Sequence, residues 1–330
     1  MFLKKMLWIY YGGKYKLRKL FLFKSKIYLN KIWLDESEGN ARLKELILSE
    51  KPFMAARFGY NEISAMKAFD FKRTVKKKKL CMDLLYKFAG FFPNDVLLGD
   101  AFLRVMKDSC SQVDLLREQG MPFEDYYINH YMNKDAIITG NIMQPWEFEE
   151  PWSAALKGKK VLVIHPFEKS IRRQYRKREF LFGQTEILPE FELKTLRAIQ
   201  SMGEEKDERF STWFDALEYM EKEINKIDFD IAIIGCGAYG FPLAAYVKRM
   251  GKQAVHMGGA SQILFGVKGQ RWVSPEWNGG QGKIYSYLNP YWEWPMEEET
   301  PKHISRLEGA YFKEGNCVGE SIKKLKRKGI

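Results

Sequence analysis

The sequence predicts an α/β protein with a mainly parallel, doubly wound sheet and a helical N-terminal extension. Two segments show this most clearly. GKKVLVIHPF, residues 158–167, has the short apolar run of a strand buried on both faces. DFDIAIIGCGAYGFPLAAYVKRMGKQAVHMGG, residues 228–259, has the pattern of a strand, a glycine turn, a helix and a second strand. Because strands that alternate with helices form parallel sheets, both segments favour this fold class.

Weaker patterns place the remaining elements. A helix is expected to end over 43–49, and PFMAARFG, residues 52–59, is a buried strand that breaks at glycine before the helical spacing of NEISAMKAF. The lysine run 76–79 is expected in a solvated loop of a mainly helical stretch. Short strands are predicted at DAIITGN, 135–141, and TEILPEF, 185–191. A helix over about 212–225 carries four apolar residues on one face: Trp213, Leu217, Met220 and Ile224.

The 330 residues, 45% of them apolar, can bury a substantial core. No repeat or low-complexity linker is visible, so the boundaries follow the element pattern. We expect a basic amphipathic extension over 1–50, a first half of the sheet with a helical middle over 51–150, a second half over 151–290, and a C-terminal wrap with a basic tail over 291–330. The wrap accounts for the late aromatic residues Trp272, Trp277, Tyr291, Trp292 and Trp294.

The positive charge lies at the two ends of the chain. The formal net charge is +12, but residues 1–34 hold nine Lys or Arg and no acid, and residues 321–330 hold five and no acid. The rest has 40 basic and 42 acidic residues, unlike a domain that binds nucleic acid over its surface. Basic segments with Trp, Tyr and Leu are typical of contact with an anionic membrane. The alternative is an N-terminal helix pair that packs on the domain with solvated lysines.

The compartment expected from the sequence is the cytoplasm, with peripheral association at the inner face of the membrane. MLWIYY, residues 6–11, is too short to span a bilayer, and the N-terminus lacks the features of a cleaved signal peptide. The four cysteines, Cys81, Cys110, Cys236 and Cys317, show no zinc-ligand spacing and are compatible with a reducing compartment.

The glycine fingerprint GCGAYG, residues 235–240, follows a strand and opens a helix with Pro242 in its first turn. Backbone N–H groups in such a turn can hold a phosphate, with Gly237 allowing close approach. A dinucleotide site would also place an acidic residue at the end of the next strand, where this chain has His256. A structural strand-to-helix turn is the alternative, since the fingerprint alone is a weak signal.

Four blocks together resemble a bacterial family of glycosyltransferases with the GT-D fold. They are MAARFGYNEISAM, GKKVLVIHPFEKSIRRQYRKREFLF, ILPEFELKTLRAIQS and FDIAIIGCGAYGFPLAAYVKRMGKQAVHMGGASQILFGVKGQRW. The resemblance covers roughly residues 50–315. It implies a Rossmann-like enzyme that moves a sugar from a nucleotide-sugar donor to a glycan, lipid-linked or protein-linked acceptor, in surface polysaccharide or glycoprotein synthesis.

The resemblance also implies a metal motif that this chain does not keep. In the family, a strand ends in Arg-aromatic-Gly-Asp-Gly-Glu, and the acidic pair holds a divalent metal, manganese or magnesium, on the donor diphosphate. Here the matching residues are Arg57, Phe58, Gly59, Tyr60, Asn61 and Glu62, so Tyr60 replaces the metal-binding Asp. No cofactor is therefore assigned, and the metal ligands stay unknown. Arg57, His165, His256 and the basic run that begins at Lys169 are expected to neutralise the diphosphate instead.

Individual residues allow structural and functional interpretations. Glu62 either caps a helix or acts as a base, with His256 as the other candidate base. Arg57 either pairs with Glu62 or contacts the diphosphate. His165 and His256 close two strands, where ligands of open parallel sheets bind. Ser261 either caps a turn or contacts a sugar. The expected substrate-binding residues are Arg57, Gly59, Asn61, His165, Lys169, Gly235, Gly237, Tyr239, Gly258, Gly259, Ser261 and Gln262.

The expected partners are a nucleotide sugar, an acceptor and an anionic membrane surface, and no nucleic acid. Two other kinds of protein remain open at this point. A non-catalytic nucleotide- or glycan-binding protein would explain the replaced Asp. A nucleotide-dependent oxidoreductase would need its cofactor at the glycine turn.

Overall fold

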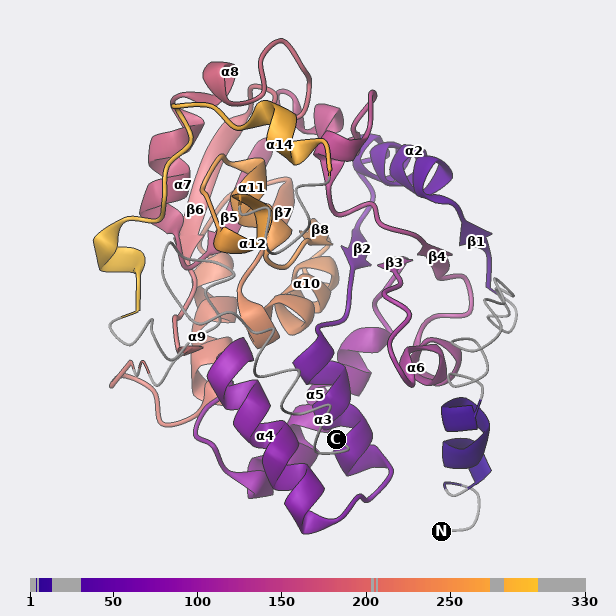
Figure 1. Ribbon diagram of the computed structural model, residues 1–330. Helices are drawn as coiled ribbons and strands as arrows, with labels where there is room; N and C mark the ends of the chain where they lie inside the picture. Colours follow the sequence, from indigo (N-terminus) through magenta and orange to yellow (C-terminus); the bar gives the residue numbers. More distant parts are fainter. Residues whose placement is uncertain are drawn as a thin grey trace.

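The computed structural model describes residues 4, 6–13, 31–202, 205, 207–273 and 282–301. In this part of the chain, eight parallel strands form one sheet in the order β1-β4-β3-β2-β8-β7-β5-β6 (Figure 1). The strands are β1 (Trp33–Leu34), β2 (Phe53–Ala56), β3 (Leu115–Arg117), β4 (Ile137–Thr139), β5 (Lys160–His165), β6 (Glu192–Arg197), β7 (Ile231–Ile234) and β8 (Gln253–His256). The predicted α/β class with a parallel sheet is confirmed.

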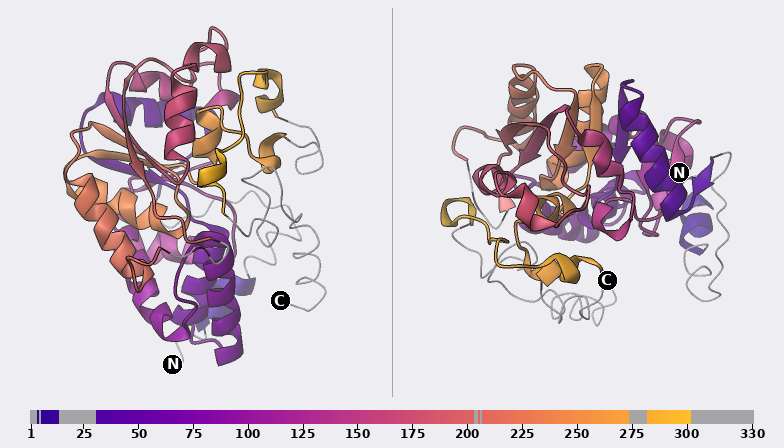
Figure 2. Two further views of the ribbon diagram at one scale, coloured as in Figure 1. Left: turned by 90° about the vertical axis from the view of Figure 1, so that its left-hand side faces the viewer. Right: turned by 90° about the horizontal axis from the view of Figure 1, so that it is seen from above.

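Helices cover both faces of the sheet, as a doubly wound fold requires (Figure 2). The longer helices are α2 (Glu36–Leu48), α3 (Tyr60–Asp70), α4 (Val75–Ala89), α5 (Gly99–Cys110), α6 (Glu124–Tyr131), α7 (Glu168–Tyr175), α9 (Trp213–Ile224) and α10 (Gly240–Arg249). The shorter ones are α8 (Arg178–Leu181), α11 (Ala260–Leu264), α12 (Gln270–Val273) and α14 (Ile284–Tyr287), with 3₁₀ turns η1 (Val96–Leu98), η2 (Pro145–Glu147), η3 (Trp152–Leu156), η5 (Gly237–Tyr239) and η6 (Glu297–Glu299).

The strands divide the interior into two hydrophobic cores because their side chains alternate between the two faces. In β2, Met54 and Ala56 join the core under α3, α4, α5, α9 and α10, while Phe53 and Ala55 join the core under α2, α7 and α11. β7 divides in the same way, with Ile234 on the first side and Ile233 on the second. This double burial explains why both strands are apolar throughout.

Local capping sets the helix boundaries that the sequence predicts. In α9, Thr212 and Asp215 form a reciprocal capping box, and all four residues of the predicted apolar face are buried. Asp35 and Glu38 form the same box at the start of α2. In the C-terminal segment, Trp272 and Trp292 are buried. Trp277 lies outside the described residues.

Three expectations about local structure are wrong. The lysine run 76–79 lies in α4 rather than in a loop. TEILPEF forms no strand. The backbone N–H of Phe191 donates a hydrogen bond to the Tyr175 hydroxyl, and the strand β6 starts one residue later, at Glu192. The short strand β3 lies within a stretch expected to be helical, because its three residues are stabilised by pairing between β2 and β4. Such non-local pairing overrides local pattern.

The strand order reverses where β2 meets β8. From β2 the chain proceeds outward through β3 and β4, whereas the second half of the chain fills the other side and returns to β2 through β7 and β8. In open parallel sheets, ligands bind outside the carboxyl ends of the strands at such a reversal. The topology therefore indicates where the functional site should lie.

The glycine turn after β7 holds three elements together. A Cβ at Gly237 would lie 2.5 Å from the carbonyl oxygen of Ala89, the last residue of α4, and Gly237 has φ of +58°. A Cβ at Gly235 would collide with the Oγ of Ser261, and one at Gly240 with the ring of His256. The close approach expected at Gly237 is therefore to the protein backbone, and this residue also lines the pocket described below.

We predict that Gly237→Ala lowers the free energy of unfolding by about 2–4 kcal/mol, from backbone strain and contact with Ala89 together. Gly251→Ala is the matched control, because Gly251 has φ of +79° but a Cβ there meets nothing within 4 Å. The control should lose only about 1–2 kcal/mol, the cost of the left-handed conformation. Urea unfolding of both variants measures the difference. Equal losses would show that the packing on Ala89 contributes nothing.

Candidate functional site

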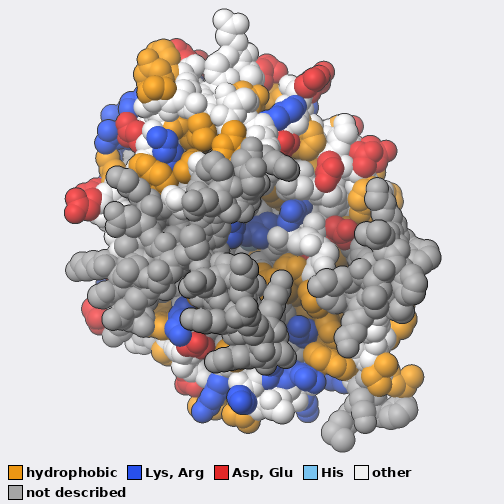
Figure 3. Space-filling model, viewed as in Figure 1, with side chains coloured by type: hydrophobic (Ala, Val, Ile, Leu, Met, Phe, Trp, Pro, Cys, Tyr) orange, Lys and Arg blue, Asp and Glu red, His pale blue; other side chains and the backbone are white. Residues whose placement is uncertain are grey.

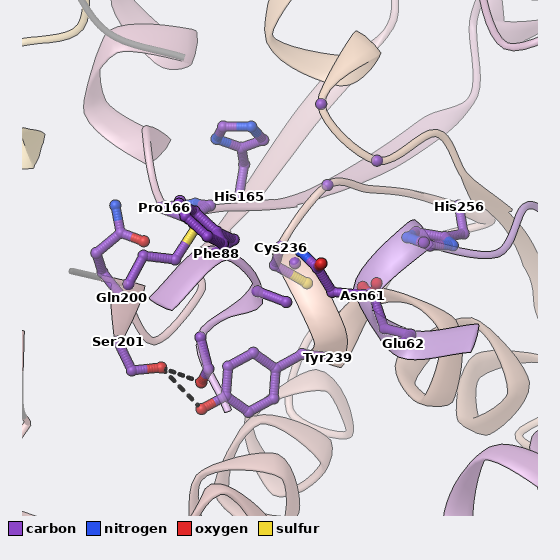
Figure 4. A pocket seen from close by; sticks show the side chains of 18 of the residues that line it. Asn61, Glu62, Phe88, His165, Pro166, Gln200, Ser201, Cys236, Tyr239 and His256 are labelled. Carbon is purple, nitrogen blue, oxygen red and sulfur yellow. Dashed lines mark hydrogen bonds between the residues drawn. The ribbon is translucent and has the colours of Figure 1, made fainter. Parts of the chain in front are cut away.

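A pocket of about 310 Å³ lies at the strand reversal. Its lining comes from the segments that follow β2, β3, β5, β6, β7 and β8, together with the C-terminal half of α4. Figure 4 shows Asn61, Glu62 and His256 on one side, Phe88, Pro166 and Gln200 on the other, and Cys236 between them. The volume is at the lower end of the range for small-molecule sites. The pocket therefore has a polar end and a mainly apolar end.

Arg57 contributes the cation at the polar end, directly after β2. Its guanidinium packs on Gly258, where a Cβ would lie 2.5 Å from Nη2 and 2.7 Å from Nε. Gly258 has φ of +61°, so both the conformation and the space require glycine. One guanidinium nitrogen, Nη1, donates to the carbonyl oxygen of Phe58 at 3.0 Å. Arg271 also lines the pocket. A planar guanidinium is well suited to phosphate oxygens.

Glu62 is the carboxyl group of the polar end. It lies in the first turn of α3, only 8% exposed, and its carboxyl group folds back against Gly59. Burial raises the pKa of Glu62, and the nearby charge of Arg57 opposes this rise only in part. Arg57 and Glu62 form no ion pair, so the structure does not support the structural alternative in which the two residues pair. A carboxylate with a raised pKa is a stronger base than an exposed one.

His165 and His256 end β5 and β8 and both line the pocket. Burial lowers the pKa of each imidazole to about 3, and the charge of Arg57 contributes to the lowering at His256. Burial therefore favours the neutral form of both rings in this structure, and the expectation that they neutralise a diphosphate stays a prediction. His165 Nδ1 accepts the backbone N–H of Phe167 at 2.9 Å.

The apolar end is formed by α4 and the segment after β6. Leu84 and Phe88 of α4 face the same space as Ile199 and Met202. The segment after β6 is fixed by Ser201, whose Oγ donates to the carbonyl oxygen of Gly90 at 2.5 Å. The hydroxyl oxygen of Tyr239 lies at hydrogen-bonding distance, 3.3 Å, from the same Oγ (Figure 4). An apolar slot beside fixed polar groups can accept the flat face of a nucleobase.

Most of the residues predicted from sequence line this one pocket. They are Arg57, Gly59, Asn61, Glu62, His165, Gly235, Gly237, Tyr239, His256, Gly258, Gly259 and Gln262. Ser261 does not line it: its Oγ is buried and donates to the carbonyl oxygen of Gly258, as a turn cap would. Lys169 does not line it either, and its Nζ pairs with Glu298 at 2.7 Å.

The basic run after Lys169 faces acidic partners outside the pocket. Arg173 and Lys177 both pair with Glu293, and Arg172 pairs with Glu168. None of these residues lines the pocket. The described contacts therefore give no support to the role expected for this run in binding the diphosphate.

Sequence reasoning missed Gln119 and Arg271. Gln119 follows the unpredicted strand β3, and its side-chain amide donates to the carbonyl oxygen of Phe58. Arg271 stands in GVKGQRW, at the end of the last block that carries the family resemblance. Its place in this block was the one feature of the sequence that could have indicated Arg271 as a site residue. Gln119 had none, because nothing local marks β3 as a strand.

The residues of the pocket do not fit the metal site that the resemblance implies. Glu62 is the one carboxylate among the described residues that line the pocket, and Tyr60, which replaces the Asp, is 65% exposed. In the described part of the chain, no group of three or more His, Cys, Asp or Glu is placed to hold a metal ion. Magnesium and manganese prefer several oxygen ligands. The described residues of the pocket therefore do not form a site suited to either ion.

Distant structural likeness exists to two solved chains of the domain of unknown function 1792. One, described as having a distinct glycosyltransferase fold, aligns with a TM-score of 0.40 and 12% identity over 69% of this chain and 78% of its own. The other, a selenomethionine-substituted structure of the domain, aligns with a TM-score of 0.41 and 12% identity, over 70% of this chain and 79% of its own. No protein-family model matches the chain, and no curated protein matches it significantly.

The low pKa of His165 predicts a pH-dependent contribution to stability. Between pH 6.5 and about 3, the unfolded chain binds a proton at His165 that the folded protein does not, so this residue destabilises the fold increasingly as the pH falls. We therefore expect the free energy of unfolding of wild type minus that of His165→Gln to fall from pH 7 to pH 4. Urea unfolding at several pH values measures it. A constant difference would mean that His165 is protonated normally.

Proposed function

We propose that this protein is a glycosyltransferase that uses a nucleotide-sugar donor. The observation that carries the proposal is the convergence of separate sequence blocks on one pocket. Three blocks that resemble the GT-D family, far apart in the chain, line the same cavity: one supplies Arg57 and Glu62, one His165, and one His256 and Arg271. The pocket lies at the strand reversal, where parallel sheets bind nucleotides.

The two ends of the pocket suit the two ends of a nucleotide sugar. We assign the nucleobase to the apolar end beside Phe88 and the diphosphate to Arg57 and Arg271 at the polar end. The sugar then lies next to Glu62. Figure 3 shows Lys and Arg side chains in the hollow at the centre of this face, a charge suited to an anionic donor.

The transfer step follows from this placement. The oxygen of the acceptor hydroxyl forms a bond to the anomeric carbon, while the bond from that carbon to the donor phosphate oxygen breaks. Glu62 takes the hydroxyl proton, and the nucleoside diphosphate leaves with its charge held by Arg57 and Arg271. His256, neutral and beside Arg57, positions the sugar by hydrogen bonding. As the resemblance implies, the acceptor belongs to surface polysaccharide or glycoprotein synthesis.

Donor binding is the first test. UDP-, GDP-, dTDP- and CMP-sugars should be screened by thermal shift with and without manganese, because a ligand that binds the folded state stabilises it. We expect one nucleotide class to raise the melting temperature. Arg57→Gln should weaken its binding roughly 10- to 100-fold, since a charge-assisted hydrogen bond is lost.

Arg104→Gln is the matched control for donor binding, because Arg104 is exposed on α5 and does not line the pocket. It should bind the donor as the wild type does. Equal donor binding by Arg57→Gln and wild type would contradict the assignment of the diphosphate to Arg57. If NADH raised the melting temperature and no nucleotide sugar did, the result would support an oxidoreductase.

Turnover is the second test. We predict that Glu62→Gln loses activity about 10²- to 10⁴-fold while donor binding is retained, because the amide cannot take a proton. The wild-type rate should rise with pH through a pKa above the usual carboxyl range, and this rise should be absent in the variant. Activity should persist in EDTA.

Glu221→Gln is the control for turnover, since burial also raises the pKa of Glu221 but this residue lies on α9, outside the pocket. Full activity in Glu62→Gln would exclude the assigned base. Loss of activity in EDTA, restored by manganese, would contradict the metal-free site. Donor binding without turnover in the wild type would favour a non-catalytic binding protein.

A further inference from the structure

Among the described residues, one face of the N-terminal helix packs closely on the domain. Residues 6–13 are helical, and Trp8 and Tyr11 face the protein. Tyr11 is 2% exposed, and the ring centroid of Trp8 lies 4.6 Å from that of Phe123. Lys4, on the same side, pairs with the buried Asp70 at 2.8 Å. These contacts fix the orientation of the helix.

The opposite face of this helix is apolar and exposed. Met6, Ile9 and Tyr10 lie at helical spacing and are 52%, 64% and 56% exposed. A helix that is apolar all round is ordinarily buried on all sides. Tight docking of one face and exposure of the other therefore indicate a second apolar environment beyond the protein.

Positive charge lies on the part of the domain that this helix packs against, next to the contact of Trp8 with Phe71. Arg73, in the turn between α3 and α4, lies 4.3 Å above the Trp8 ring and so joins the two elements. Lys72, Lys76 and Lys79 are exposed on the same turn and on the start of α4, beside the 64% exposed Val75. Figure 3 shows Lys and Arg along the lower edge of this view, with hydrophobic side chains next to them.

These lysines are placed at a cost to the fold. Four consecutive lysines, 76–79, occupy the first turns of α4, which has no acidic residue in its first turn. Cations near a helix N-terminus oppose the helix dipole and repel one another. Lys72, Lys76 and Lys79 form no ion pair with any described residue, whereas Lys222 and Lys226 pair with nearby glutamates. An anionic partner would offset this repulsion.

We propose that Met6, Ile9, Tyr10, Lys72, Val75, Lys76 and Lys79 form a docking surface for an anionic lipid bilayer. Exposed aliphatic and aromatic side chains enter the boundary between headgroups and acyl chains, while lysines contact the headgroups. This combination favours a bilayer over nucleic acid, which offers no apolar layer. No helix among the described residues has the length and apolar character to cross a membrane.

The surface is connected to the pocket by α4. The helix begins at Val75 in the docking surface, and Phe88 near its other end lines the pocket, roughly 20 Å away at 1.5 Å per residue. A bilayer at this surface would hold a lipid-linked acceptor near the pocket. This consequence rests on the proposed function, whereas docking itself does not.

Vesicle binding tests the surface in the full chain. Truncation is unsuitable, because removing Trp8 and Tyr11 would uncover the core. We compare wild type with a triple variant Met6→Ser/Ile9→Ser/Tyr10→Ser and a triple variant Lys72→Gln/Lys76→Gln/Lys79→Gln. The control variant, Lys157→Gln/Lys222→Gln/Lys226→Gln, removes equal charge from exposed positions elsewhere. Circular dichroism verifies that each variant is folded.

Wild type should sediment with phosphatidylglycerol vesicles and not with phosphatidylcholine vesicles. Both surface variants should bind at least ~10-fold more weakly, and the control should stay within about twofold of wild type. Unchanged binding by either surface variant, or equal binding to both lipids, would overturn the proposal. Preference for DNA or an acidic polypeptide over vesicles would also overturn it. Because no turnover is measured, the result is independent of the proposed activity.

Discussion

Parallel pairing of all eight strands is the constraint on which the rest of the described structure depends. Since every strand runs in the same direction, all carboxyl ends lie at one edge, and the segments that follow them meet there. The reversal between β2 and β8 leaves the crevice that becomes the pocket. Arg57, His165 and His256 reach it from three different strands for this reason alone.

The glycines make this convergence tight enough to shape a site. Because these glycines have no side chain, the Arg57 guanidinium can pack on Gly258, the His256 ring on Gly240, and the end of α4 on Gly237. Each of these glycines therefore allows close packing of a side chain or helix end that lines the pocket. A fingerprint that suggests phosphate binding from sequence has a structural reason at every glycine.

Burial sets the chemistry within the pocket. Desolvation lowers the pKa of both histidines and raises that of Glu62, so Arg57 and Arg271 are the cations among the described residues that line the pocket. Among the described residues, the arrangement is one buried carboxyl group near the guanidinium of Arg57. This differs from the paired carboxylates of a metal-dependent site, and Tyr60, which is largely exposed, accounts for the difference.

The sequence by itself determined the fold class and the elements at 53–56, 160–165, 213–224 and 231–256, because buried strands, capping boxes and glycine turns are local signals. Most of the site residues that it predicted also line the pocket, although the apolar end of the pocket was not predicted. It could not determine β3 or Gln119, whose placement depends on pairing with distant strands. Tertiary structure also decided that Lys169 and Ser261 face away from the pocket and that burial favours the neutral form of both histidines. The physical reason is that side-chain direction and desolvation are properties of packing, which no local pattern encodes.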